Sequence, residues 1–400
     1  MFANKYLYKN NNESLINESP KERTGIIVMI PCFREPDILK TLESINACYL
    51  PDSNVEVIVL INHSEQADDT IKNFNQRTKA ELDNWITQNT CDRICFYAVG
   101  PVDLKKKWAG AGLARKKGMD EAVRRLNLLE KPDGIIVSLD ADTLVDKNYL
   151  IEIEKHFQIN KKDVGATLAF EHQKNELDER QLEGIVLYEK YLDYYKRSLD
   201  FAGYPYSMFT IGSAFAVKAL AYVKRGGMNR RQAGEDFYFL QNLVQIGTVG
   251  EISTTKVYPS ARLSDRVPFG TGPILHKWMK GEEDLTQSYN FRAFLDLKKF
   301  FDTIDQLYKI TETQFHQNLE QLPISVSDFI RKDKFWDELN DLNKNCSTLQ
   351  AFQNRFFQKF NAFKVLKYLN FAHEIYFSKA DLPEQTELLN QEILSQGNVK

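Results

Sequence analysis

Short apolar runs alternate with segments of helical periodicity over the first third of this chain. The runs have the length of buried strands and cover residues 26–30, 55–61, 94–99 and 135–139. The segments between them carry apolar side chains at helical spacing and cover residues 37–48, 70–87 and 113–129. This alternation predicts an α/β fold in which a mostly parallel sheet has helices on both faces. Ligands of such sheets bind beyond the carboxyl ends of the strands.

A change of composition near residue 281 predicts a second region. The chain has 400 residues, which exceeds the usual size of one hydrophobic core. From about Gly281 onward glycine almost vanishes, while Phe, Leu, Lys and Glu recur at helical spacing. We therefore expect a polar tail over residues 1–24, an α/β domain over residues 25–280 and a helical region over residues 281–400.

Charge and hydropathy exclude several classes of partner. The formal net charge of -3 gives no general attraction to nucleic acid. No apolar run approaches the roughly 20 residues that span a bilayer, and the N-terminus lacks the apolar core of a signal peptide. The five cysteines form no paired framework, which is typical of a reduced cytosolic protein. We expect a cytoplasmic protein without transmembrane segments, and residues 298–301 and 352–363 are the places for a peripheral contact with the inner face of the membrane.

Two carboxylates follow the fourth apolar run. Asp140 and Asp142 are two residues apart, and side chains two apart in an extended segment point the same way. Paired hard oxygen ligands suit Mg²⁺ or Mn²⁺, which bind a few carboxylates together with substrate phosphates. The pair therefore favours an enzyme that works on a phosphorylated substrate.

Further motifs accompany the Asp pair in a fixed order. They are the turn Pro31–Glu35, the glycine-containing helix start at residues 107–118, the small-residue segment 210–218 with the Gly226-Gly227 turn, and the acidic helix start Gly234-Glu235-Asp236. With the Asp pair, these segments resemble the motifs of the family-2 glycosyltransferases, which are inverting enzymes of the GT-A fold. The resemblance covers roughly residues 25–250. It implies that residues 25–280 form a Rossmann-like GT-A catalytic domain that transfers a hexosyl or N-acetylhexosaminyl group from a nucleoside-diphosphate sugar.

The resemblance also implies where the sugar donor binds. The nucleotide would lie against Pro31, Phe33, Glu35 and Asn62. The diphosphate would lie against Gly110 and Arg115, and the ribose or sugar near Asp140, Gly212 and Ser213. Arg262 and Arg266 would clamp the diphosphate from a loop near residues 264–272.

The metal ligands and the catalytic base follow from the same match. Asp142 would coordinate Mn²⁺ or Mg²⁺, with Asp140 beside it and His276 as a third ligand. Asp236 would act as the general base on the acceptor hydroxyl, and Glu235 would orient the acceptor. The acceptor would be a glycan, a lipid or a small molecule, and the helical region would cover the sheet or form a contact between the subunits of a homo-oligomer.

Two departures from the family pattern narrow these expectations. Asn62 stands where the family usually has an acid against the base, and an amide permits bases other than uracil because it both donates and accepts. The Gln-x-x-Arg-Trp motif of processive members is absent, since residues 274–278 keep only the Trp and a cation. Processive polysaccharide synthesis is therefore not expected.

Three alternatives compete with this interpretation. The run 135–145 also fits the first motif of haloacid-dehalogenase-like phosphatases, with Asp140 as nucleophile and Asp142 as acid/base. That motif normally opens its domain, however, and here strand–helix steps precede it. A nucleotidyltransferase would share the sheet but usually has a glycine-rich loop after the first strand, and residues 31–36 contain no glycine. A non-catalytic sugar-binding protein would keep its role without Asp142 or Asp236.

Overall fold

The computed structural model describes residues 1–10, 13–231, 234–264 and 270–397, which form two compact units. The first unit comprises Met1–Glu179 and Thr210–Lys277, and the second comprises Arg180–Phe209 and Trp278–Lys400. The second unit thus takes in residues 180–209 as well as the C-terminal part of the chain. The division of the chain at residues 24 and 280 stays a prediction.

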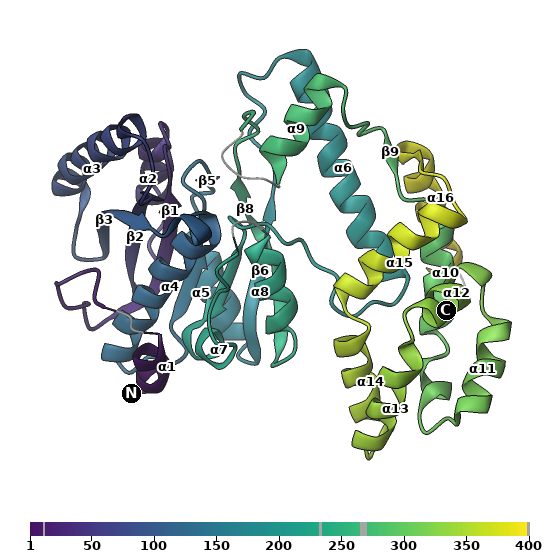
Figure 1. Ribbon diagram of the computed structural model, residues 1–400. Coiled ribbons are helices and arrows are strands. Elements are labelled where there is room, and N and C mark those ends of the chain that lie inside the picture. The colour runs from purple at the N-terminus through teal and green to yellow at the C-terminus, as the bar shows by residue number, and fades with distance from the viewer. Residues whose placement is uncertain (11–12, 232–233, 265–269, 398–400) are drawn as a thin grey trace. The chain divides into compact units, whose positions relative to one another are not determined.

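An eight-stranded sheet forms the centre of the first unit (Figure 1). In spatial order its strands are β3 (Ile94–Leu104), β2 (Asn54–Ser64), β1 (Thr24–Cys32), β4 (Ile135–Ser138), β7 (Phe215–Lys218), β6 (Asp163–Phe170), β8 (Thr248–Tyr258) and β5 (Leu144–Val145). The pairs β3–β2, β2–β1, β1–β4 and β6–β8 are parallel, whereas β7 is antiparallel to both of its neighbours. The predicted Rossmann-like, mostly parallel α/β sheet is confirmed.

Helices cover both faces of this sheet because buried strands are apolar on both sides. The helices of the unit are α1 (Asn4–Lys9), α2 (Ile38–Asn46), α3 (Asp69–Asn89), α4 (Ala111–Leu128), α5 (Tyr149–Ile159), α7 (Ala219–Lys224) and α8 (Glu235–Leu243), with a 3-10 turn at Lys106–Trp108. On one face, alternate residues of β1 such as Ile26 and Val28 pack with α2, α3 and α5. On the other face Gly118 of α4 lies against Met29, where a β-carbon would come within 2.3 Å of the methionine side chain.

Helix α1 lies within the predicted polar tail and packs on α4 through a buried polar cluster. The Tyr6 hydroxyl donates to Asp120 at 2.7 Å, and the Lys116 ammonium donates to Tyr6 and to Asp120, each at 2.9 Å. A buried charge needs a partner of opposite charge, and the paired Lys116 and Asp120 lie one helical turn apart on α4. These contacts fix the helix that also carries Arg115.

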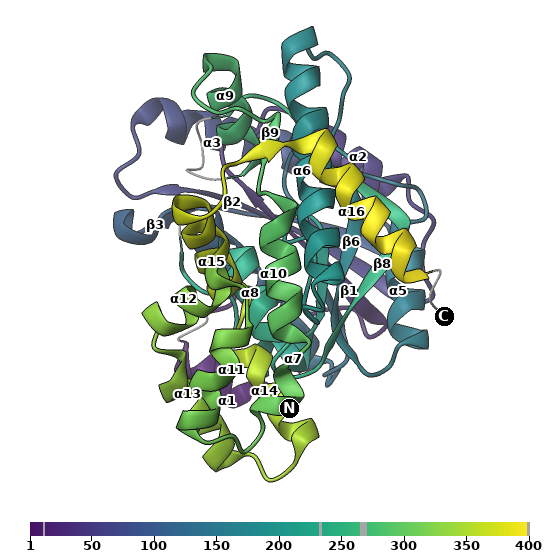
Figure 2. The ribbon, with the colours of Figure 1, turned by 90° about the vertical axis from the view of Figure 1, so that its right-hand side faces the viewer.

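The second unit is helical and has an aromatic core. Its helices are α6 (Glu179–Phe201), α10 (Phe291–Phe301), α11 (Glu312–Gln321), α12 (Ile324–Lys332), α13 (Phe335–Asn345), α14 (Leu349–Lys359), α15 (Ala362–Ile375) and α16 (Leu382–Gly397), with a 3-10 turn at Ile304–Leu307 and a short ladder of β9 (Gln287–Ser288) and β10 (Ala380–Asp381) (Figure 2). Helix α9 (Thr271–Lys280) spans the boundary between the units. Buried Phe300, Phe335, Phe356 and Phe360 pack with ring centroids 5.3–6.4 Å apart. The predicted C-terminal helical region is confirmed.

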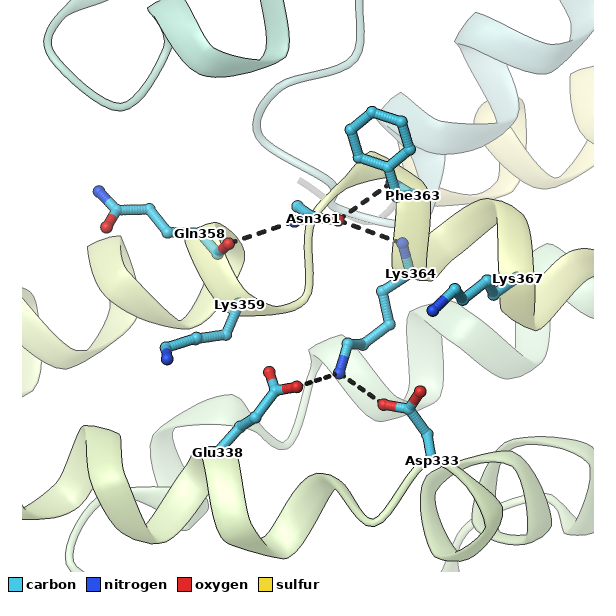
Figure 3. A pocket seen from close by; sticks show the side chains of 8 residues that line it. All are labelled: Asp333, Glu338, Gln358, Lys359, Asn361, Phe363, Lys364 and Lys367. Carbon is cyan, nitrogen blue, oxygen red and sulfur yellow. Dashed lines mark hydrogen bonds and ion pairs between the residues drawn. The ribbon is translucent and has the colours of Figure 1, made fainter. Parts of the chain in front are cut away.

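A polar depression on the second unit is built around Lys364 (Figure 3). Its ammonium group contacts Glu338 at 2.8 Å and Asp333 at 2.5 Å, so that α15 is tied to α13 and to the end of α12. Because both acids are already paired with this lysine, we assign the depression a structural role.

In the parts of the chain that the structure describes, no helix is long and apolar enough to cross a membrane.

Candidate functional site

Three of the predicted motifs meet at one edge of the sheet. Strand β1 is parallel to β2 and β4, so the carboxyl ends of all three point the same way. Asn62 near the end of β2, the segment after β1 and the Asp pair after β4 therefore lie at the edge where such sheets bind ligands. One detail differs from expectation: β1 runs through Pro31 and Cys32, so Pro31 belongs to the strand and the turn begins after it.

The backbone that carries the Asp pair is anchored on several sides. The Thr41 hydroxyl of α2 donates to the carbonyl of Ala141 at 2.9 Å, and the Gln173 amide donates to the carbonyl of Asp142 at 2.9 Å. The amide of Thr143 donates to the carbonyl of Asp140 at 3.2 Å, which closes the turn. This bonding holds two partly exposed carboxylates in fixed places, as a binding site requires.

Arg115 gathers predicted residues from four segments. It lies on the second turn of α4 with only 3% of its side chain exposed. Its Nη2 donates to Asp140 Oδ1 at 2.9 Å, and its Nε donates to Glu235 Oε1 at 3.1 Å. Its Nη1 donates to the carbonyl of Gly212 at 3.0 Å and to the Ser138 hydroxyl. The sequence placed Arg115, Asp140, Gly212 and Glu235 in one site, and the structure brings these four together.

Asp236 lies beside this cluster at the start of α8. Its Oδ1 accepts a hydrogen bond from the amide of Phe237 at 2.7 Å. Burial raises the pKa of Asp236 to about 7, and the Glu235 carboxylate acts in the same direction, whereas the Arg115 charge opposes the rise. A carboxyl group that titrates near neutral pH can take a proton from a substrate hydroxyl and later release it.

A second arginine joins acids from two other segments. Arg262, which follows β8, donates from Nη2 to both oxygens of Glu35 at 2.7 and 2.8 Å and from Nη1 to Asp37 at 2.6 Å. The same Nη2 lies 3.6 Å from Asp142 Oδ2. Arg262 thus links the turn after β1 to the Asp pair. Arg266, named with it from the sequence, lies outside the described residues.

A polar chain runs from the end of β2 to that of β3. Asn62 donates to the carbonyl of Cys32 at 3.0 Å, and Asn75 of α3 donates to the carbonyl of Asn62 at 2.9 Å. Asn75 also contacts His63 Nδ1 at 3.0 Å, and His63 Nε2 lies 3.1 Å from Asp103. Sequence reasoning placed Asn62 and His63 at this edge but missed Asn75 and Asp103. The available signal for Asn75 was its place one turn before Thr78 and two turns before Leu82, on the buried face of α3.

The other predicted residues also lie in the first unit. Phe33 is half-buried in the turn after β1, and Gly110 precedes α4. Ser213 is fully buried, and its hydroxyl has no hydrogen-bond partner among the described residues. His276 lies on α9. Among the described residues no three His, Cys, Asp or Glu side chains gather around a point that could hold a metal, so the structure does not join His276 to the Asp pair in such a group.

The close approach at Gly212 gives a stability prediction. A β-carbon there would lie 2.6 Å from Arg115 Nη2 and 3.3 Å from Asp236 Oδ2. We expect Gly212→Ala to push Arg115 away from Asp140 and to lower the free energy of unfolding by about 1–3 kcal/mol, as overpacking does. Urea unfolding measures this change. Ser213→Ala is the matched control, because it removes only an unpartnered hydroxyl and should leave the unfolding free energy within about 0.5 kcal/mol of wild type; an equal loss in both variants contradicts the packing argument.

Comparison with known proteins finds no matching family model and no matching curated protein. Solved structures do show similarity. TarS from S. aureus is 11% identical over 74% of this chain, with a TM-score of 0.38; this chain spans about half, 47%, of its length. TarS 1-349 in complex with UDP-GlcNAc is 10% identical, with 83% of this chain and 89% of that one covered and a TM-score of 0.40. The mannosyltransferase PcManGT from Pyrobaculum calidifontis, in complex with GDP-Man and Mn²⁺, is 13% identical, with 98% and 86% covered and a TM-score of 0.36.

Proposed function

We propose that this protein is an inverting glycosyltransferase that moves a sugar from a nucleoside-diphosphate sugar to an acceptor hydroxyl by metal-assisted single displacement. One observation carries the proposal: Asp236, whose pKa lies near 7, adjoins a buried arginine that also holds Glu235 and Asp140. In the proposed reaction Asp236 serves as the proton acceptor, and two further acids and the charge of Arg115 lie beside it. The order of the sequence motifs supports the same class of reaction.

The donor set at the Asp pair fits Mg²⁺ or Mn²⁺. The side chains of Asp140 and Asp142 are 36% and 25% exposed, and an ion of this type needs only one or two carboxylates when water and substrate phosphates complete its shell. Asp142 would hold the ion with Asp140 beside it. A bound divalent ion supplies Lewis-acid stabilisation of the departing nucleoside diphosphate.

The protein's own residues account for the remaining steps. The ionised Asp236 accepts the proton of the acceptor hydroxyl as that oxygen attacks the anomeric carbon. Glu235 orients the acceptor and is itself held by Arg115. Most donor groups of Arg115 are used within the protein, so its main role is to position the acids and to place a positive charge beside the departing diphosphate. Glu35 and Asn62 contribute to the nucleotide subsite, and Gly212 and Ser213 leave room for the sugar.

A release assay tests the proposed reaction. The protein is incubated with UDP- and GDP-sugars and an extract of cellular glycans and lipids, and the nucleoside diphosphate is measured. We expect release from one donor class, a loss of at least about 100-fold in EDTA, and recovery on addition of Mn²⁺. Release of inorganic phosphate from p-nitrophenyl phosphate, without any nucleoside diphosphate, contradicts the proposal in favour of a phosphatase. Donor binding without any release contradicts it in favour of a sugar-binding protein.

A further inference from the structure

Tyr6 of α1 joins two helices of the first unit. Its hydroxyl donates to Asp120 Oδ1 at 2.7 Å and accepts from the ammonium of Lys116 at 2.9 Å, and both partners lie on α4. The same Asp120 oxygen accepts from the Tyr222 hydroxyl of α7 at 2.9 Å. The rings of Tyr6 and Tyr222 are buried and pack edge to face, with centroids 6.1 Å apart. One side chain of the N-terminal helix therefore contacts both α4 and α7.

The Tyr6 hydroxyl also lies against the turn that follows α7. A β-carbon on Gly227 would come within 1.9 Å of that oxygen, so only a glycine leaves room for it. The amide of Gly227 donates to the carbonyl of Tyr222 at 2.9 Å, which ties the turn to α7. Gly226 has a similar φ, +80° against +78° for Gly227, but a β-carbon there would meet no atom of the described residues within 4 Å. The close approach is thus specific to Gly227 and Tyr6.

From this turn the chain continues to the start of α8. Asn229 donates from its side chain to the carbonyl of Glu235 at 3.4 Å and accepts the amide of Arg231 at 3.0 Å. The carbonyl of Arg231 packs against Gly112 of α4, where a β-carbon would come within 2.0 Å of it. The described part of the segment that leads to Asp236 is therefore held against α4, the same helix that α1 ties to the turn.

We propose that Tyr6 is a positioning residue of the proposed active site, which keeps Asp236 in place beside Arg115. The inference rests on the proposed function, because it takes Asp236 as the base. Arg115 directly precedes Lys116 on α4, and Asp236 follows the turn that lies against Tyr6. Without the tyrosine, α4 and the turn lose the side chain that both of them contact. A displacement of a reacting group by about 1 Å can cost about 100-fold in rate.

Variants of α1 test this proposal in the release assay. We expect Tyr6→Leu to lower kcat about 10–100-fold while the KM for the donor stays within about threefold of wild type, because the base is displaced and the donor subsite is not. Tyr6→Phe keeps the ring and should lose less. Tyr8→Leu is the matched control: Tyr8 is 88% exposed on the same helix, and the variant should have the kcat of wild type.

Two glycine variants test the same contact from the side of the turn. Gly226→Ala and Gly227→Ala impose similar backbone strain, but only the second brings a β-carbon against the Tyr6 hydroxyl. Gly227→Ala should therefore have the lower kcat, by about tenfold. Adding Tyr6→Phe to Gly227→Ala should restore kcat toward that of Gly226→Ala, because the oxygen that the β-carbon meets is then absent.

The Asp236→Asn background separates positioning from a general loss of folding. This variant lacks the group that Tyr6 positions, so adding Tyr6→Leu should cost it less than about threefold in kcat. Amide hydrogen exchange gives a readout without turnover. In Tyr6→Leu we expect exchange over residues 235–243 to be at least about tenfold faster than in wild type and in Tyr8→Leu, because the start of α8 is less firmly held.

The outcomes distinguish the role of Tyr6 from the proposed function. An active wild type with equal kcat losses from Tyr6→Leu with and without Asp236, or with unchanged exchange over residues 235–243, overturns the positioning role and leaves the proposed function standing. Equal kcat in Gly226→Ala and Gly227→Ala does the same, and it applies even if Tyr6→Leu does not fold. No release by wild type from any donor overturns the proposed function and the role of Tyr6 with it.

Discussion

Asp236→Asn is expected to lower sugar transfer by about 10²–10⁴-fold while leaving donor affinity within about threefold of wild type, because an amide of nearly the same shape cannot accept the acceptor's proton. The measurement compares kcat with the Kd for the donor. Asp163→Asn is the control and should retain most of the activity. Asp163 is a buried aspartate of β6, remote from Arg115, and it pairs with His156 of α5 at 3.0 Å. Full activity in Asp236→Asn would remove this residue from the role of base.

The raised pKa of Asp236 makes a linked prediction for the pH dependence of wild type. Activity should rise with pH along a limb with an apparent pKa near 7, since only the ionised carboxylate accepts a proton. The Glu235 charge raises the pKa of Asp236, so Glu235→Gln should move this limb to lower pH. A limb near pH 4 in wild type contradicts the assignment.

The same pKa sets the sign of a stability effect. In the folded protein Asp236 has a pKa of about 7, above its ordinary value of 3.8, so the folded state binds this proton more tightly than the unfolded state does. The resulting stabilisation is fully present below about pH 4 and is lost as the pH rises through 7. Asp236→Asn should therefore be more stable than wild type above pH 7, by about 1–3 kcal/mol, in urea unfolding.

The second large effect is expected at Arg115. Arg115→Met should lower the free energy of unfolding by about 3–5 kcal/mol, because it leaves Asp140 and Glu235 without their buried cation. Arg23→Met is the matched control in the same unit. Arg23 is exposed and donates to the carbonyl of Asp52 at 3.0 Å, so we expect the free energy of unfolding to change by no more than about 0.5 kcal/mol.

A double variant shows whether the loss comes from the unpaired acids. Combining Arg115→Met with Glu235→Gln should restore part of the stability, since one of the two stranded charges is then absent. Urea unfolding at pH 8, where the acids are ionised, measures all three proteins. Additive losses in the double variant would contradict the ion-pair account of the site.

The sequence alone predicted the strands of one half of the sheet. The runs at residues 26–30, 55–61, 94–99 and 135–139 are apolar on both faces, and all four became parallel neighbouring strands. Because the carboxyl ends of parallel strands share an edge, the meeting of Asn62 and the Asp pair at that edge followed from the pattern alone. Gly212 and Glu235 are linked to the Asp pair through Arg115. The order of the sequence motifs had placed these residues in one site.

Other parts of the fold and of the site had no local signal in the sequence. Strand β8 was not predicted, because much of it is exposed and its sequence TVGEISTTKVY is polar at most positions. The pairing of Asp37 with Arg262 joins residues 225 positions apart, and nothing near either residue indicates the other. Residues 180–209 belong to the helical unit although the change in composition begins only at 281, since tertiary packing and not composition decides this grouping.

In the proposed reaction the edge of the sheet binds a nucleoside-diphosphate sugar together with a divalent cation held by Asp142. Calorimetric titration of UDP-GlcNAc, GDP-mannose and related donors measures this binding, with and without Mn²⁺, in wild type, Asp142→Asn and Asp236→Asn. We expect one donor to bind wild type and Asp236→Asn alike when Mn²⁺ is present, and Asp142→Asn to bind it at least about tenfold more weakly. A donor that binds Asp142→Asn as tightly as wild type, or the absence of binding by any donor, would contradict it.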